Sequence, residues 1–297
     1  MLKRKFFNKV FLTTVIFFIV FTFCNLKMIS YNEKKKENDN KETIYTLNKE
    51  GYVSKTEVYV GKVFTLEDKI REKLEIMIKE NNKNALLPSY FKPILPENTK
   101  VLEVIVDDSL VKIYFSRELN NISDEQAEKM IEAIVYTITD ENILGIEIYV
   151  DGKLLKYVPH TKKELPVVLT KDFGINKKYE INNTNDIVKV VMTYFINCDD
   201  RLCEVPVTKY ANDTREKLEI VFDDLSSISD KQLISLLENV KLIDYKITNK
   251  TIIINLNKDI DDDETNIIVS SIFNNYDVNK IVILVNNHKK LVKTIEK

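Results

Sequence analysis

The chain has 297 residues, of which 44 are basic and 46 acidic, so its formal net charge at pH 7 is -2. Such a small net charge supplies no field that would hold nucleic acid by counterion release. With 5 glycines, the chain also has no Gly-rich loop that would cradle phosphate. We therefore expect no nucleic acid partner and no nucleotide cofactor. The length allows about two modest domains.

The amino terminus has the pattern of a membrane segment. Four basic residues, Lys3, Arg4, Lys5 and Lys9, precede an apolar run over residues 10–23. Bulky residues stand where signal cleavage needs small ones, so we expect residues 1–29 to be an uncleaved single-pass anchor with the rest of the chain outside the cytoplasm. Cys24 ends the run, and its lipidation is the alternative, although Phe23 stands where a lipoprotein box has a small residue.

Residues 30–50 consist mainly of Asn, Lys, Glu and Asp. A segment of this composition cannot bury enough apolar area to offset the entropy lost on ordering. We expect a flexible polar linker that holds the following domains off the membrane.

Three blocks of sequence occur twice in the same order, which indicates an internal duplication. The hexapeptide at 71–76 recurs at 215–220, the stretch 100–119 aligns without a gap on 241–260, and 145–152 matches 280–287. We therefore expect two copies of one unit. The expected domains cover residues 51–160 and 185–297, with a connector over 161–184.

Hydrophobic periodicity predicts the elements of the first copy. Helical spacing behind a Thr65 cap predicts an amphipathic helix from Leu66 to Met77. Alternation over 101–106 and 110–115 predicts a β-hairpin. Ser123 and Gln126 form an expected capping box before a helix whose apolar face contains Ala127, Met130, Ile131, Ile134 and Ile138. An alternating strand over 146–150 follows.

This order predicts an α+β fold for each copy, namely a small mixed or antiparallel sheet with two helices packed on one face. The second copy adds an expected opening hairpin, with strands over 188–196 and 202–207. Pro206 indicates an edge position for the second of these strands.

The chain resembles the GerM domain family of sporulation and spore germination proteins, especially its two-domain members. The resemblance covers the chain from about Gly51 onward. It is carried by the segments 56–60, 95–101, 111–116, 133–139 and 150–152, and in the second copy by 194–196 and 205–209. Two departures from the pattern stand out. We expect the first copy to lack the return strand of its opening hairpin, and the second has Asn286-Asn287 in place of Asp151-Gly152.

The resemblance implies an envelope role in sporulation. It also implies domains similar to the ring-building modules of spore-assembly machines, and it supplies no catalytic residues to carry over. Expected partners are envelope or spore-assembly proteins and the membrane, with peptidoglycan as a further candidate.

Few side chains have the pattern of a reactive site. We expect His160 and His288 to be surface residues, because neither has a neighbour of metal-ligand type. The acidic run over 259–264 has oxygen ligands suited to calcium but lacks the glycine and spacing of a calcium loop, so we expect it to begin a helix. We predict no catalytic residue, metal or cofactor.

Cys198 and Cys203 flank a predicted turn. A hairpin could bring them together as a disulfide in an oxidising envelope, or they could remain reduced, and the sequence leaves both possibilities open.

Two functions remain compatible with the sequence. The leading one is a non-catalytic scaffold or protein-interaction component. The alternative is a peptidoglycan- or glycan-binding module with stacking surfaces from aromatic residues at Tyr52, Tyr59, Tyr90, Phe91 and Tyr114. Hydrolysis is not supported, because no nucleophile has a positioned base.

Overall fold

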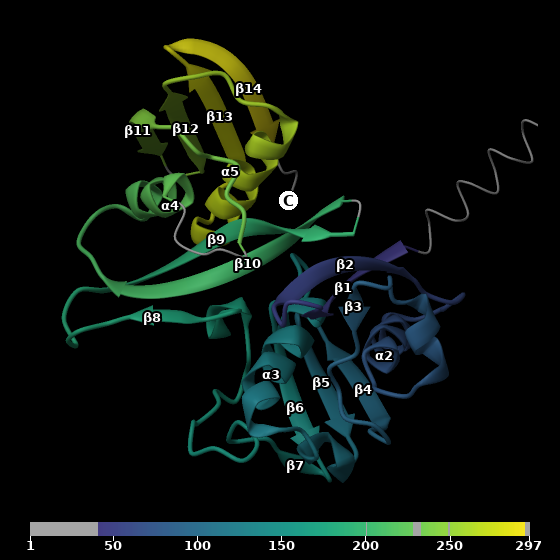
Figure 1. Cartoon of the computed structure of the whole chain (residues 1–297). Coiled ribbons are helices and arrows are strands. Elements are labelled where there is room, and N and C mark those ends of the chain that lie inside the picture. The colour runs from purple at the N-terminus through teal and green to yellow at the C-terminus, as the bar shows by residue number, and fades with distance from the viewer. Residues whose placement is uncertain (1–40, 200, 228–232, 249, 295–297) are drawn as a thin grey trace, which may run out of the picture. The chain divides into compact units, whose positions relative to one another are not determined.

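The computed structural model describes residues 41–199, 201–227, 233–248 and 250–294 (Figure 1). The predicted anchor, Cys24 and most of the predicted linker lie outside these residues. Among the described residues, no helix is long and apolar enough to cross a membrane. The fold is α+β, as predicted, and each copy has a mixed sheet with helices packed against it.

The first copy opens with a β-hairpin followed by a helix-covered sheet. Its strands are β1 (Lys41–Asn48), β2 (Val53–Tyr59), β3 (Phe91–Lys92), β4 (Val101–Asp107), β5 (Leu110–Phe115), β6 (Gly145–Val150) and β7 (Lys153–Leu154). Its helices are α2 (Leu66–Ile76) and α3 (Asp124–Ile138), with short 3-10 turns η1 (Asn82–Leu86) and η2 (Arg117–Asn120).

Strand β1 corrects two predictions. Residues 41–48 belong to a strand and not to a linker, and β1 pairs with β2 in a sheet of order β2-β1-β3. The first copy therefore has both strands of its opening hairpin. The strand was not predicted because the average composition of residues 30–50 is polar. In the structure Ile44 and Leu47 are buried, and so are the polar residues Thr46 and Asn48.

The main sheet of the first copy has the order β4-β5-β6-β7. β5 and β6 run parallel, and the outer pairs run antiparallel. α2 contacts β4 and α3 contacts β6. The apolar faces predicted for both helices are buried over most of their length, including Leu74, Met130 and Ile134, each 0% exposed, whereas Leu66 at the start of α2 is 42% exposed.

The predicted helix caps have different outcomes. Thr65 caps α2, because its hydroxyl accepts from the Asp68 N–H at 3.1 Å. Ser123 stands at the cap position of α3, but its side chain makes no capping bond, so the predicted capping box is wrong. The Gln126 N–H instead donates to the Ser123 backbone carbonyl at 3.0 Å, which satisfies that donor without the hydroxyl.

The second copy repeats this architecture in strands β9 (Ile187–Cys198), β10 (Arg201–Asn212), β11 (Leu242–Thr248), β12 (Thr251–Leu256), β13 (Lys280–Val285) and β14 (His288–Thr294). Its helices are α4 (Lys217–Ser226) and α5 (Asp262–Asn275), which both contact β9 (Figure 1). The sheet order is β11-β12-β13-β14, again with a parallel central pair.

The duplication extends to a defect in the sheet. β4 pairs with β5 through a bulge between Val101 and Glu103, and β11 pairs with β12 through a bulge between Leu242 and Asp244. The bulged residues Leu102 and Ile243 occupy matched positions and are each 54% exposed. A bulge leaves its extra residue outside the regular pairing and re-aims its side chain. Each copy therefore presents one aliphatic side chain to solvent at the same place.

The opening hairpin of the second copy is confirmed, with one correction. A short connector strand, β8 (Lys178–Glu180), pairs in parallel with β10, so the order is β8-β10-β9 and β10 is not an edge strand as Pro206 had indicated. Proline is tolerated there because the ladder with β8 reaches Lys209–Ala211 and stops short of Pro206. The connector also contains a short 3-10 turn, η3 (Lys171–Phe173).

Candidate functional site

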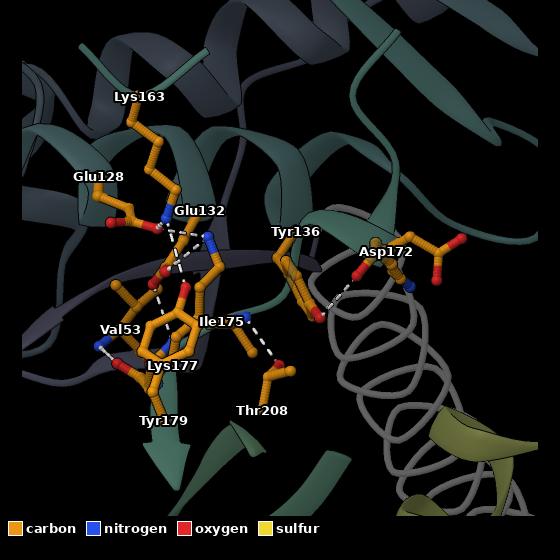
Figure 2. A network of polar contacts seen from close by, with 12 residues as sticks. Val53, Glu128, Glu132, Tyr136, Lys163, Asp172, Ile175, Lys177, Tyr179 and Thr208 are labelled. Carbon is orange, nitrogen blue, oxygen red and sulfur yellow. Dashed lines mark hydrogen bonds and ion pairs between the residues drawn. The ribbon is translucent and has the colours of Figure 1, made fainter. Parts of the chain in front are cut away.

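A group of charged side chains lies where α3 meets the connector, and two of them, Glu132 and Lys177, are buried (Figure 2). Glu128 and Glu132 are four residues apart, so a helix places them one above the other on the same face. The side chains of Ala127, Met130 and Ile131 are fully buried. Glu132 is 2% exposed, although its carboxyl is ionisable, because it lies inside the buried stretch of α3.

Connector residues supply the partners of both carboxylates. Lys177 Nζ lies 2.6 Å from Glu128 Oε1 and 3.5 Å from Glu132 Oε1, and its side chain is 5% exposed. Lys163 Nζ lies 2.5 Å from the same Glu128 oxygen. The Asn176 N–H donates to Glu132 Oε2 at 2.8 Å. Two carboxylates and two ammonium groups thus balance within one cluster, as burial of charge requires.

Asn176 joins this cluster to two hairpins. Its Nδ2 donates to the carbonyl oxygens of Val53 on β2 and Pro206 on β10, at 2.7 and 2.8 Å. Its Oδ1 accepts from the Val53 N–H at 2.9 Å. Asn176 has a backbone φ of 45°, a left-handed conformation that Asn tolerates better than most residues. We call Glu128, Glu132, Asn176 and Lys177 the connector clasp.

Neighbouring contacts hold the part of the connector that precedes the clasp. Ile175 exchanges two hydrogen bonds with Thr208 of β10: its N–H donates to Thr208 Oγ1 at 2.9 Å, and its carbonyl accepts from the Thr208 N–H at 2.8 Å. The Tyr136 hydroxyl on α3 donates to the Lys171 carbonyl at 3.2 Å. Lys177 Nζ also lies 3.3 Å from the centroid of the Phe173 ring, a cation–π contact.

Burial shifts the ionisation of the clasp. Loss of solvation raises the pKa of Glu132 to about 7, although Lys177 and the Asn176 N–H favour its charged form. Burial lowers the pKa of Lys177 for the same reason. For Glu128, burial acts to raise the pKa, but hydrogen bonds from Lys163 and Lys177 outweigh it and the pKa is lowered. Glu132 is therefore the carboxyl of the clasp that titrates near neutrality.

A hollow of about 280 Å³ adjoins the clasp. Its lining combines charged and aromatic side chains: Tyr52, Glu125, Glu128, Lys129, Glu132, Asn176, Lys177, Lys178 and Tyr179. The charges of the clasp face one another, and Lys129 donates to the Gly51 carbonyl at 2.6 Å. In the part of the chain that the structure describes, no group of three or more His, Cys, Asp or Glu side chains could hold a metal ion. The hydrogen bonds of Asn176 in this arrangement position the connector against β2 and β10.

The structure joins Cys198 and Cys203 in a disulfide, with Cα atoms 5.8 Å apart. The two residues are not directly opposite, because the register pairs Cys198 with Arg201 and Cys203 with Ile196. The cross-link closes the tip of the β9–β10 hairpin. Asp199 at this tip accepts a hydrogen bond from Ser89 Oγ at 3.1 Å and lies 3.6 Å from Lys49 Nζ.

The other predicted sites are scattered. His160 and His288 are exposed, and a ring nitrogen of His160 lies 2.7 Å from the Asn120 carbonyl oxygen. The acidic run begins α5 as expected: Asp261 and Glu264 form a reciprocal capping box, with bonds of 2.8 Å in both directions. Helix capping therefore explains why Asp261 and Glu264 occur at the start of α5.

The aromatic candidates do not form one surface. Tyr90 and Phe91 are buried, Tyr52 is half-buried, and Tyr59 is exposed. Tyr114 stacks on Tyr149 of the neighbouring strand, with ring centroids 4.6 Å apart. Tyr149 was not among the candidates, because register between strands is needed to find it.

Sequence reasoning also missed the clasp. One signal was available: Glu132 interrupts an otherwise apolar run on a predicted helix, which indicates a buried charge that needs a partner. The partners, Asn176 and Lys177, come from a segment 44 residues away, as shown by the Asn176–Glu132 bond. No local pattern connects the two segments.

Comparisons with known proteins agree on one family. Residues 43–156 match the Germane family, described as "Sporulation and spore germination". The spore germination protein GerM of Bacillus subtilis (strain 168) is 25% identical over 269 residues, which cover 84% of this chain and 72% of that protein. The solved structure of the tandem GerMN domains of the sporulation protein GerM from Bacillus subtilis has a TM-score of 0.78 at 22% identity, covering 86% of this chain and 96% of that one. The structural likeness shows that the tandem fold is shared.

Proposed function

Because the chain belongs to the GerM domain family, we propose that it is a non-catalytic, membrane-tethered envelope protein that serves as a scaffold in sporulation or spore germination. The observation that carries the proposal is the extent of the similarity to the spore germination protein GerM, which includes both copies of the unit. The family match begins at residue 43, so the first of the two proposed domains includes β1.

The chemistry of the clasp supports a structural role. Its charged groups neutralise one another, and its hydrogen bonds end on backbone atoms of β2 and β10. Buried polar groups used in this way order chain segments relative to one another. A catalytic site would need convergent groups around a place for the reacting atoms.

The matched bulges support a role in binding other proteins. Leu102 and Ile243 are each 54% exposed, and the residues that follow them, Glu103 and Asp244, are acidic and exposed. A solvent-exposed aliphatic side chain contributes little to the stability of its own sheet. Its presence at the same bulge in both copies is consistent with two equivalent contact points for partner proteins.

Location outside the cytoplasm rests on the amino-terminal sequence, with its basic residues followed by an apolar run over 10–23. We propose that residues 1–29 anchor the chain, or that Cys24 carries a lipid, and that the Cys198–Cys203 disulfide forms in the oxidising environment beyond the membrane.

Site-specific crosslinking tests the scaffold proposal. A photoreactive residue is placed at Leu102 or at Ile243 of the full-length chain, and intact cells are irradiated at the onset of sporulation. Exposed Glu141, on the loop after α3, serves as the control position. We expect both bulge positions, but not the control, to capture the same discrete envelope or spore-assembly protein. Capture of cytoplasmic proteins alone, or equal capture at all three positions, would contradict the proposal.

Glycan binding is the second candidate function, and the stacked Tyr114–Tyr149 pair is the observation that favours it. The pair is half-buried, and the Tyr149 hydroxyl donates to Glu147 Oε2 at 2.7 Å. Sedimentation with purified cell wall separates the two functions. Loss of sedimentation in Tyr114→Ala and Tyr149→Ala, with Tyr157→Ala as the exposed control, would favour a glycan-binding module. Wild-type protein that stays in solution would exclude it.

A further inference from the structure

The surface between the first helix and the edge strand of the main sheet differs between the two copies. In the first copy α2 packs against β4, whereas in the second α4 packs mainly against β9 and α5. At matched strand positions, Val101 and Val104 are each 7% exposed, but Leu242 and Tyr245 are half-buried. A groove of about 450 Å³ therefore lies between α4 and β11. Its volume is within the range of about 300–1,000 Å³ that is typical of ligand clefts.

Tyr245 joins α4 to β11 across this groove. Its hydroxyl donates to Glu219 Oε1 on α4 at 2.7 Å, and a tyrosine side chain is large and rigid. The matched residue of the first copy is Val104, which is short and has no hydroxyl. A long side chain thus separates helix and strand in the second copy, where a short one lets them pack in the first. The groove lining also includes the buried side chains of Phe222 and Val240.

The first copy shows which chemical group fits this surface. The guanidinium of Arg71 on α2 donates to the carbonyl oxygen of Val101 on β4. Arg215 stands at the matched position of the repeated hexapeptide, but it bonds to Asp213 at 2.8 Å and to Asp223 at 3.2 Å. The arginine of the second copy is therefore directed away from the strand that its counterpart contacts.

The Leu242 carbonyl is the counterpart of the Val101 carbonyl. The preceding carbonyl, of Lys241, accepts from the Asn257 N–H at 3.1 Å, which lies directly after β12. Successive carbonyls of a strand point to opposite sides, so the Leu242 carbonyl points away from β12. Among the described residues, it lacks the guanidinium that the Val101 carbonyl has.

The charges around the groove favour a cation. Its lining contains the carboxylates of Glu219, Asp223 and Asp244 and the cations Arg215 and Lys241. Arg215 is already paired with carboxylates, whereas Asp223 is 63% exposed and Asp244 is also exposed. A guanidinium has five N–H donors and no acceptor, so one arginine can bond a backbone carbonyl and a carboxylate together.

We propose that the α4–β11 groove binds an arginine of a partner protein that is flanked by aliphatic side chains. The guanidinium meets the Leu242 carbonyl and the exposed carboxylates, and the aliphatic neighbours lie beside Ile243. The inference rests on the proposed scaffold function, in which Ile243 contacts a partner, and it names the chemistry of the segment that docks there. The first copy does not take the same segment, because Arg71 already occupies the Val101 carbonyl.

Binding of short peptides to the full-length chain tests the groove. The probe is a short fluorescent peptide in which arginine alternates with leucine, and its control has glutamine in place of arginine. We expect the arginine peptide to bind about tenfold more tightly in fluorescence anisotropy at low salt, because glutamine lacks the charge of a guanidinium. Equal affinities, or no binding of either peptide, would overturn the inference.

Two substitutions with matched controls locate the binding site. Asp244→Lys reverses an exposed charge and should weaken binding of the arginine peptide about tenfold, whereas Glu103→Lys, at the matched bulge of the first copy, should leave it unchanged. Ser226→Trp fills the groove and should abolish binding, whereas Ser227→Trp changes the adjacent exposed residue outside the lining and should not. Equal effects of a variant and its control would contradict the assigned site.

Chemical shifts of the wild-type chain cover the case in which a variant does not fold. Addition of the arginine peptide should move the amide signals of Leu242 and Tyr245 and leave those of Val101 and Val104 in place. Shifts confined to the first copy would refute the groove without any variant.

Crosslinking from Ile243 in cells separates this inference from the scaffold proposal. Undiminished capture of an envelope protein by a chain that also carries Ser226→Trp would leave the scaffold proposal standing and overturn the groove. Peptide binding as expected without capture of any protein would support the arginine site and contradict the scaffold proposal. Self-association of the chain that Ser226→Trp removes would identify a second copy as the occupant and overturn the inference.

Discussion

The two copies share their sheets but differ in how their opening hairpins are secured. Ile113 and Ile254 occupy matched positions on β5 and β12, and both are 0% exposed. The bulges at Leu102 and Ile243 also coincide. By contrast, the first hairpin is extended by β3, whereas the second is extended by β8 and closed at its tip by a disulfide. Core packing and sheet register have been retained since duplication, while the hairpins have acquired different supports.

The repeated hexapeptide shows that identical sequence need not give identical contacts. Leu74 and Leu218 are both buried, as are Ile76 and Ile220. However, the Arg71 guanidinium donates to the Val101 carbonyl, which ties α2 to β4. Arg215 instead bonds to Asp213, which precedes α4, and to Asp223, which lies on α4. A groove of about 450 Å³ lies between α4 and β11 there. The apolar positions are constrained by the core, and the charged ones are not.

The largest expected effect tests the shared core. Ile113→Ala and Ile254→Ala each remove a fully buried side chain, so each should lower the free energy of unfolding by about 4 kcal/mol. Urea denaturation measures both. Similar losses would support equivalent cores, whereas a loss below about 1 kcal/mol at one site would show that the matched strand is not packed equivalently.

The next effect tests the clasp, which has no counterpart in the duplication. Asn176→Ala leaves the Val53 and Pro206 backbone groups without their buried partner and places Ala at a positive φ. We expect a loss of about 3 kcal/mol in urea denaturation. Asn185→Ala, at an exposed position just after the connector, is the control and should change stability by less than about 0.5 kcal/mol. Equal effects of the two variants would contradict the role of Asn176.

The disulfide should matter less, because the loop that it closes is short. Replacing Cys198 and Cys203 by Ser should cost about 2 kcal/mol, as expected from loop-closure entropy. Reduction of the wild-type protein should lower the melting temperature similarly, and the double variant should no longer respond to reductant. A double variant that still responds would show that the bond is not the cause.

The smallest effect concerns the bulges. Leu102→Ser and Ile243→Ser change exposed side chains, so each should alter the free energy of unfolding by less than about 0.5 kcal/mol. Thermal unfolding checks this expectation. A large loss in either copy would mean that the bulged residue serves its own fold, and it would remove the argument that these residues are kept for a partner.

Periodic segments were predictable from sequence, and contacts between distant segments were not. The apolar stripe of α3 and the alternation in β5 carry their own signal, since each element must bury one face. β1 was missed because its buried residues include Thr46 and Asn48, which are typical of a linker. The clasp was missed because Glu132 and Asn176 are far apart in sequence and are brought together by the tertiary fold, in which Asn176 also contacts β2 and β10.

The measurement that tests the central claim most directly is calorimetric unfolding of the wild-type chain beside Asn176→Ala. The claim is that two copies of one unit are coupled through the connector clasp into a single scaffold. Coupled domains unfold together, and weakly joined domains unfold separately. We predict one cooperative transition in the wild type that separates into two in Asn176→Ala. Two transitions already present in the wild type, or one unchanged transition in the variant, would contradict the claim.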